Sequence, residues 1–148
     1  MKLRLLATAL CLYLTPLAAR ADNQASQSSP FATHHLLLQL SDSSMAKQKL
    51  VISVANSILK DYGPDNVSID VVAFGPGVEM LFAKSPERIA VDSLMAQGVH
   101  FDVCMNTIDT IKRDTGHAPE LNPKANQVAY GVGRIMALVE QGYILVRP

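Results

Sequence analysis

Residues 94–107, LMAQGVHFDVCMNT, are expected to join a helix, a strand and a second helix with almost no linker between them. Gly98 is expected to end the first helix, because glycine readily adopts the left-handed conformation that follows many helices. The apolar run over residues 99–105 predicts a buried strand. The second helix is expected over residues 106–113.

The same alternation of strand and helix continues along the chain. Apolar runs predict strands over residues 34–40, 67–74, 99–105, 125–130 and 143–146. Apolar positions at helical spacing predict helices over residues 44–61, 86–97, 106–113 and 131–141. Strands that alternate with helices form right-handed crossovers and a mostly parallel sheet with helices on both faces. We therefore expect a three-layer α/β/α domain with a sheet of about five strands.

Three details of the helices can also be predicted. Ser85 is expected to cap the second helix, with Pro86 in its first position. A short helical piece is expected over residues 78–82, after a tight turn at residues 75–77. The first and last helices are each expected to have one apolar face, formed by Val51, Val54, Ala55 and Ile58 and by Val132, Ile135, Met136 and Val139 respectively.

The first 21 residues have the pattern of a secretory signal peptide. Lys2 and Arg4 precede an almost unbroken apolar run over residues 5–14, and Ala19 and Ala21 match the small residues before a cleavage site. An uncleaved membrane anchor is the alternative, but the run is shorter than the roughly 20 residues that span a bilayer. We therefore expect cleavage after Ala21, a periplasmic or secreted protein, and no stable membrane anchor.

The rest of the chain is expected to form one domain after a short leader. Residues 22–32 are mostly small and polar, which predicts a disordered leader, and residues 33–148 have the length of a single domain. Loss of residues 1–21 would leave 10 basic and 13 acidic residues, a net charge of −3. A mildly acidic chain without a basic run lacks the electrostatic pattern of nucleic-acid and anionic-membrane binding. We therefore expect no nucleic acid among its partners.

Cys104 is the main candidate for chemistry. Because Cys11 would leave with the signal peptide, Cys104 would be the lone thiol and no internal disulfide could form. It lies at the end of an expected strand and just before an expected helix, whose free N–H groups favour a thiolate. Asn106 or Thr107 is expected to cap that helix, and Asp102 lies on the same strand face as a candidate supporting residue. The alternative is that Cys104 packs in the core as a small hydrophobic residue.

Gly75 and Gly77 form a second candidate element, a Gly-Pro-Gly turn directly after an expected strand. Functional groups in parallel sheets gather beyond the carboxyl ends of the strands, where Cys104 also lies. The glycines could let the backbone approach an anion, or they could form only a tight turn. The turn lacks the lysine of a phosphate-binding loop and the glycine pattern of dinucleotide sites, so no cofactor is predicted. No metal site is predicted either, because the adjacent His34 and His35 would point to opposite faces of a strand.

Residues 71–81, 94–107 and 130–148 together resemble the DsrE/DsrF-like family associated with sulfur oxidation, most closely its exported, single-domain branch. The most specific part is the strand that ends in Cys-x-Asn-Thr at Cys104. The resemblance implies a flavodoxin-like or Rossmann-like fold and an oligomer, typically a trimer or hexamer. In the sulfur-handling members one cysteine accepts a persulfide and passes it to a partner protein, and by motif position Cys104 is similar to that residue.

Three functions remain open from the sequence. The first is a sulfur carrier or sulfurtransferase-like protein that uses Cys104, with a donor or acceptor protein as partner. The second is a non-catalytic oligomeric module that binds a small ligand or anion beside Gly75, Gly77, Cys104 and Asn106. The third is an interaction subunit in which Cys104 is only part of the core.

Overall fold

The domain is formed around a five-stranded sheet in which every pair of neighbouring strands is parallel. A computed structural model describes residues 31–148, so the expected signal peptide and residues 22–30 of the expected leader lie outside the described residues. The strands occur in the order β4-β3-β2-β1-β5. Their bounds are β1 His34–Leu40, β2 Val67–Ala73, β3 His100–Cys104, β4 Asn126–Val128 and β5 Ile144–Val146. The predicted parallel sheet of about five strands is confirmed.

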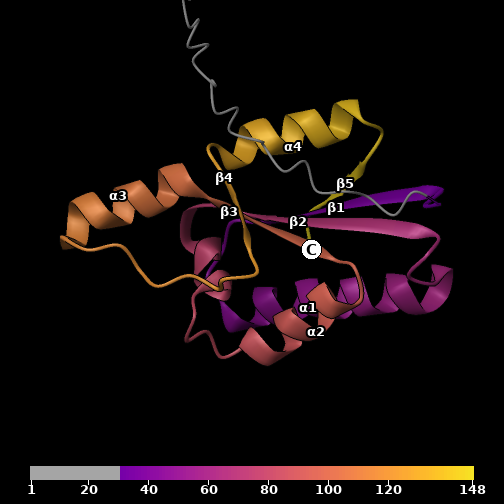
Figure 1. Cartoon of the computed structure of the whole chain (residues 1–148), viewed down its shortest axis with the longest axis horizontal. Helices are drawn as coiled ribbons and strands as arrows, with labels where there is room; N and C mark the ends of the chain where they lie inside the picture. The colour runs from indigo at the N-terminus through magenta and orange to yellow at the C-terminus, as the bar shows by residue number, and fades with distance from the viewer. Residues whose placement is uncertain (1–30) are drawn as a thin grey trace, which may run out of the picture.

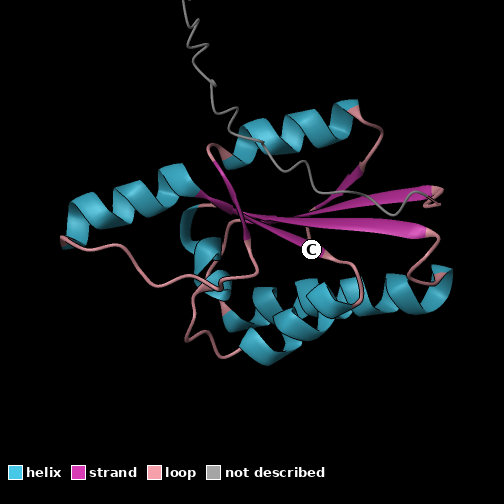
Figure 2. Cartoon of the chain, in the orientation of Figure 1, coloured by secondary structure: helices cyan, strands magenta, loops and turns pink. Residues whose placement is uncertain are grey.

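Helices cover both faces of the sheet, as expected for three layers (Figures 1 and 2). Their bounds are α1 Met45–Tyr62, α2 Arg88–Ala96, α3 Met105–Thr115 and α4 Gly131–Glu140, with a 3-10 helix, η1, over Gly75–Leu81. Figure 1 shows α1 and α2 side by side on one face, α4 on the opposite face, and α3 extending outward from the end of β3. Strands β1 to β4 follow one another across the sheet, and the chain then returns to place β5 beside β1. Because crossovers are right-handed, this reversal puts α4 on the opposite face.

The two faces of the sheet have different interiors. The face under α1 and α2 carries the larger apolar core, which includes Leu38, Val71 and Phe101. The face under α4 carries a smaller apolar cluster of Leu37, Val72, Ile135, Leu138 and Tyr143. The α4 face also contains polar side chains, among them two aspartates that interact with Arg134 of α4.

Two predictions about helix starts are wrong. Helix α2 begins at Arg88 rather than at residue 86, and Glu87 occupies the position that Ser85 was expected to fill. Before the helix the chain makes a turn in which the Arg88 N–H donates to the Ser85 carbonyl oxygen at 3.1 Å and the Glu87 N–H donates to Ser85 Oγ at 3.3 Å, so Ser85 caps this turn rather than α2. The expected tight turn at residues 75–77 is instead the first part of η1, which continues to Leu81.

The inward face of α4 also differs from the prediction. Ile135 is buried as expected, but Val132, Met136 and Val139 are 56%, 60% and 45% exposed. The buried residues of α4 are Gly131, Ile135 and Leu138. In α1, by contrast, Val51 and Ala55 are buried as predicted, together with Gln48 and Leu59.

Candidate functional site

Cys104 ends β3 and directly precedes α3. The helix begins at Met105, one residue earlier than predicted, so Cys104 itself occupies the N-cap position, and no side chain caps the helix. The prediction that Asn106 or Thr107 caps α3 is therefore wrong, because both residues lie within its first turn. The strand passes into the helix without a linker, which leaves its last residue as the cap.

The Cys104 sulfur meets the start of a second helix. The Gly131 N–H, at the first position of α4, donates to Cys104 Sγ at 3.2 Å. A Cβ atom on Gly131 would lie 3.0 Å from Phe74 Cβ and 3.2 Å from Cys104 Cβ, closer than ordinary carbon contacts of about 3.5–4.0 Å. Only glycine allows this approach without displacement, so residue 131 brings its own N–H, one of the free donors at the start of α4, to the sulfur.

Thr107 links the sulfur to the Gly-Pro-Gly segment. The Gly75 N–H donates to Thr107 Oγ1 at 3.0 Å, and the Thr107 side chain lowers the pKa of Cys104. A hydroxyl that accepts one hydrogen bond still has its own proton to donate. Gly75 has φ of +52°, which favours glycine at this position. The structure therefore brings Cys104, Thr107 and Gly75 together.

These donors make the Cys104 thiol more acidic. Burial raises the pKa of Cys104, which is only 5% exposed, but hydrogen bonds from Gly131 and Thr107 lower it further than burial raises it. The backbone of Asn106 contributes in the same direction. The pKa therefore falls below that of an ordinary thiol, and a thiolate is the nucleophilic form of cysteine.

The other predicted site residues have different surroundings. The Gly77 N–H donates to the Phe74 carbonyl oxygen at 3.2 Å, and a Cβ atom at Gly77 would collide with the Leu40 carbonyl group. Gly77 thus permits close packing of η1 on β1. The Asn106 side chain is exposed, and the Asn106 N–H donates to the Ala129 carbonyl oxygen at 3.1 Å.

Asp102 belongs to an ionic cluster that the sequence analysis missed. Arg134 Nε lies 2.6 Å from Asp102 Oδ2, and Arg134 Nη2 lies 3.0 Å from Asp70 Oδ1. Both aspartate side chains are 0% exposed, and the Arg134 side chain is 16% exposed. Asn126 Nδ2 also donates to Asp102 Oδ1 at 3.2 Å. Asp102 therefore joins β3 to β4 and α4 through Asn126 and Arg134, and these hydrogen bonds do not involve the Cys104 sulfur.

Further polar groups continue this cluster toward the amino ends of the strands. Burial raises the pKa of Asp70, as does the neighbouring Asp102 carboxylate, while His100 and Arg134 oppose this rise. The Tyr143 hydroxyl lies 2.8 Å from Ser68 Oγ, and burial raises the pKa of Tyr143 to about 12. Polar residues at alternate positions of otherwise apolar strands, such as Ser68 and Asp70 in β2, were the signal that could have revealed the cluster.

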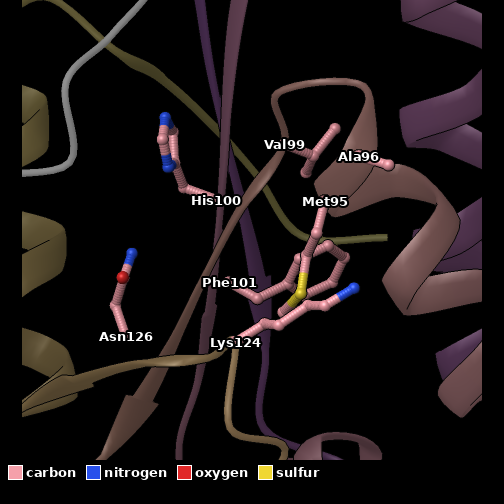
Figure 3. Close-up of a pocket in the computed structure, with 7 residues that line it drawn as sticks. All are labelled: Met95, Ala96, Val99, His100, Phe101, Lys124 and Asn126. Atoms are coloured by element: carbon pink, nitrogen blue, oxygen red, sulfur yellow. The ribbon is translucent and has the colours of Figure 1, made fainter.

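Among the cavities formed by residues 31–148, two lie toward the amino ends of the strands, away from Cys104. One of about 340 Å³ is lined by Met95, Ala96, Val99, His100, Phe101, Lys124 and Asn126. Figure 3 shows His100 and Asn126 on one side of β3 and Met95 and Phe101 on the other, so this cavity wraps around the edge of β3. β4 pairs only with residues 102–104, which leaves that edge open. The other cavity, of about 240 Å³, lies beside His34, Tyr62 and Ile144.

Within residues 31–148, no group of three His, Cys, Asp or Glu side chains is arranged to hold a metal ion. None of the helices in this part of the chain is long and apolar enough to cross a membrane.

Comparison with known proteins supports the fold without assigning a function. No protein-family model matches the chain, and no curated protein matches it. A solved structure of a protein of unknown function, MTH1491 from Methanobacterium thermoautotrophicum, is similar, with a TM-score of 0.69 and 28% sequence identity. The similarity covers 78% of this chain and 99% of that one. The two proteins therefore share the parallel α/β architecture across nearly the whole of MTH1491.

Proposed function

We propose that this protein is a sulfane-sulfur carrier of the DsrE/DsrF-like family and that Cys104 holds the transferred sulfur as a persulfide. The observation that carries the proposal is the 3.2 Å hydrogen bond from the Gly131 N–H to Cys104 Sγ, supplemented by Thr107. These donors favour the thiolate that such chemistry requires. The resemblance of the segment ending in Cys-x-Asn-Thr to that family supports the same function.

The proposed reaction is an exchange between sulfur atoms. The Cys104 thiolate attacks the outer sulfur of a persulfide donor, a bond forms between Sγ and that sulfur, and the donor's S–S bond breaks. The donor leaves as a thiolate, so charge is conserved and no external oxidant or reductant is needed. A thiolate on an acceptor protein then attacks the terminal sulfur on Cys104 in the same manner. The leaving group of this second step is the Cys104 thiolate, which Gly131 and Thr107 stabilise.

The small exposed fraction of Cys104 limits which donors can react. Only 5% of the residue is exposed, so the attacking geometry suits a small sulfur species or the slender end of a protein persulfide. We expect thiosulfate, polysulfide and small persulfides to react faster than bulky thiol reagents. Transfer to an acceptor protein would take place at the edge of the sheet where α3 and α4 begin.

Intact-mass measurement tests the proposed function. The chain is used with Cys11→Ser, so that Cys104 is its only cysteine, and is incubated with thiosulfate, polysulfide or a persulfide donor. We expect a mass gain of one sulfur atom that a thiol reductant removes. The variant that carries both Cys11→Ser and Cys104→Ser should gain no mass. A chain that reacts with a small alkylating reagent but gains no sulfur from any donor contradicts the proposal.

The same measurements separate the two alternative functions. In a non-catalytic binding module, Cys104→Ser leaves binding of the ligand intact and the wild-type chain gains no sulfur. In an interaction subunit with a purely structural cysteine, native Cys104 resists small alkylating reagents at neutral pH.

We also propose an exported homo-oligomer, a trimer or hexamer. The export proposal rests on the sequence of residues 1–21, and N-terminal sequencing of the mature protein tests whether cleavage follows Ala21. The oligomer proposal is supported by apolar side chains on the outer face of α4, where Val132 and Met136 are exposed, and by Ile144 of β5, which is 69% exposed. Light scattering on the eluted protein gives the number of subunits.

A further inference from the structure

Arg134 connects the first turn of α4 to the buried strands β2 and β3 through two ion pairs. Its guanidinium group reaches Asp102 on β3 at 2.6 Å and Asp70 on β2 at 3.0 Å. The Arg134 N–H also makes the first hydrogen bond of the helix, to the Tyr130 carbonyl oxygen at 3.0 Å. The same residue therefore belongs to the first turn of α4 and anchors that turn to the sheet.

The ion pairs of Arg134 lie next to the hydrogen bond between the Gly131 N–H and Cys104 Sγ. Gly131 and Arg134 are three residues apart on α4, a rise of about 4.5 Å along the helix. Their partners Cys104 and Asp102 are two residues apart on β3, about 6.6 Å along the strand. The helix runs antiparallel to the strand, so the two contacts match in register and hold the same helical turn at two points.

The first turn of α4 lacks large buried apolar side chains. Gly131 and Gly133 both lie in it, and each glycine weakens a helix by about 1 kcal/mol relative to alanine. The buried apolar anchors of the helix, Ile135 and Leu138, come later. Because hydrogen bonds weaken steeply with distance and angle, a small shift of this turn would weaken the contact with Sγ.

We propose that Arg134 is a positioning residue for Cys104: by bridging Asp70 and Asp102 it holds the Gly131 N–H against Sγ. This inference rests on the proposed function, because it concerns the thiolate that the sulfur transfer uses. The Arg134 guanidinium group interacts with the carboxylates of Asp70 and Asp102, and the other titratable groups near Asp70 are His100 and Tyr143. Since Arg134 bonds to these carboxylates and not to Sγ, its effect on the sulfur comes through the position of the helix.

The test is Arg134→Lys in the chain that carries Cys11→Ser. Lysine keeps the positive charge but lacks the planar fork that bridges two carboxylates. The rate of Cys104 alkylation by iodoacetamide, followed against pH, gives the thiol pKa. We expect this pKa to rise, so that the alkylation rate at neutral pH falls about threefold to tenfold: complete loss of a hydrogen bond to a charged group would cost roughly one pKa unit, or tenfold, and this variant weakens the bond in part.

A matched control distinguishes positioning from a general loss of an ion pair. Arg88→Lys alters the pair between Arg88 and Asp92, at 2.9 Å on α2, on the other face of the sheet. We expect this control to leave the Cys104 pKa unchanged. The inference is overturned if Arg134→Lys folds, has a lower free energy of unfolding, and keeps the wild-type thiol pKa.

A second variant keeps the inference testable if Arg134→Lys does not fold. Asp70→Asn removes one arm of the bridge and keeps the pair between Arg134 and Asp102. Loss of a nearby negative charge would by itself lower the thiol pKa, whereas loosening of α4 raises it, so a rise supports positioning and an unchanged or lower value overturns it. Sulfur loading is measured separately. A thiol pKa that depends on Arg134 in a chain that gains no sulfur refutes the sulfur carrier and leaves the positioning role standing.

Discussion

Gly131→Ala should weaken the contact between α4 and the Cys104 sulfur. The added Cβ atom would lie 3.0 Å from Phe74 Cβ and 3.2 Å from Cys104 Cβ. Neither of these Cβ atoms can move by a side-chain rotation, so relief requires the start of α4 to shift by roughly half an ångström to reach ordinary carbon contacts. The N–H donor of residue 131 moves with the helix, and its 3.2 Å contact with Sγ lengthens.

The size of the effect follows from two opposing contributions to stability. Alanine favours the helix by up to about 1 kcal/mol relative to glycine, whereas overpacking costs about 1–3 kcal/mol. We expect the free energy of unfolding to fall by about 1 kcal/mol. The thiol pKa should rise by about one unit, because a hydrogen bond to a charged group is worth about 1.5–3 kcal/mol and one unit corresponds to about 1.4 kcal/mol.

Gly133→Ala is the matched control for this prediction. A Cβ atom at residue 133 would lie 3.7 Å from Tyr130 Cβ, which is an ordinary contact. This variant should gain helix stability of up to about 1 kcal/mol and keep the Cys104 pKa. Urea unfolding gives the stability, and alkylation against pH gives the pKa. The reasoning is refuted if Gly131→Ala keeps the wild-type pKa, or if Gly133→Ala raises the pKa equally.

Three further predictions concern the sulfur and the surface of α4. Thr107→Val should raise the Cys104 pKa and lower the free energy of unfolding by about 1–3 kcal/mol, because it leaves the Gly75 N–H without its acceptor; Thr107→Ser should preserve both values in the same assays. Because the pKa of Cys104 is lowered in the folded state, the unfolded chain binds more protons just below the ordinary thiol pKa, so stability should rise with pH in that window relative to Cys104→Ser; equal pH slopes in urea unfolding would contradict this. Met136→Glu should reduce the subunit number in light scattering without lowering stability, since Met136 is 60% exposed; an unchanged subunit number excludes this face from the interface.

The sheet was predictable because strand signals are local. The strands β1 and β2 were predicted within one residue, since each is a short segment rich in apolar or β-branched residues between turn residues. The parallel arrangement followed from the alternation with helices. The phase of α4 was not predictable in this way, because apolar residues occur around most of its circumference. The inward face contains Arg134, which a rule of apolar residues inside assigns to the surface.

The candidate site was predictable only in part, for a related reason. Cys104 was placed at the end of a strand and the start of a helix by local sequence, and both features are present. The donor at Gly131 lies 27 residues further along the chain, and the pairing of Asp70 with Arg134 spans 64 residues. No local pattern reports such contacts. The alternating polar residues Ser68 and Asp70 in the buried strand β2 were the one local sign that charged side chains lie under α4.

The parallel sheet explains why two helix starts can meet at one sulfur. All five strands run in the same direction, so each helix that follows a strand begins at the same edge of the sheet. Helix α3 follows β3 directly, while α4 follows β4 and crosses the opposite face, so Cys104 lies between the two starts. Apolar residues in place of the buried ionic cluster under α4 would often give equal or greater stability. Stability alone therefore gives little reason for two buried carboxylates beneath α4, whereas fixing the first turn of that helix beside Cys104 requires a directional contact such as the one that Arg134 makes.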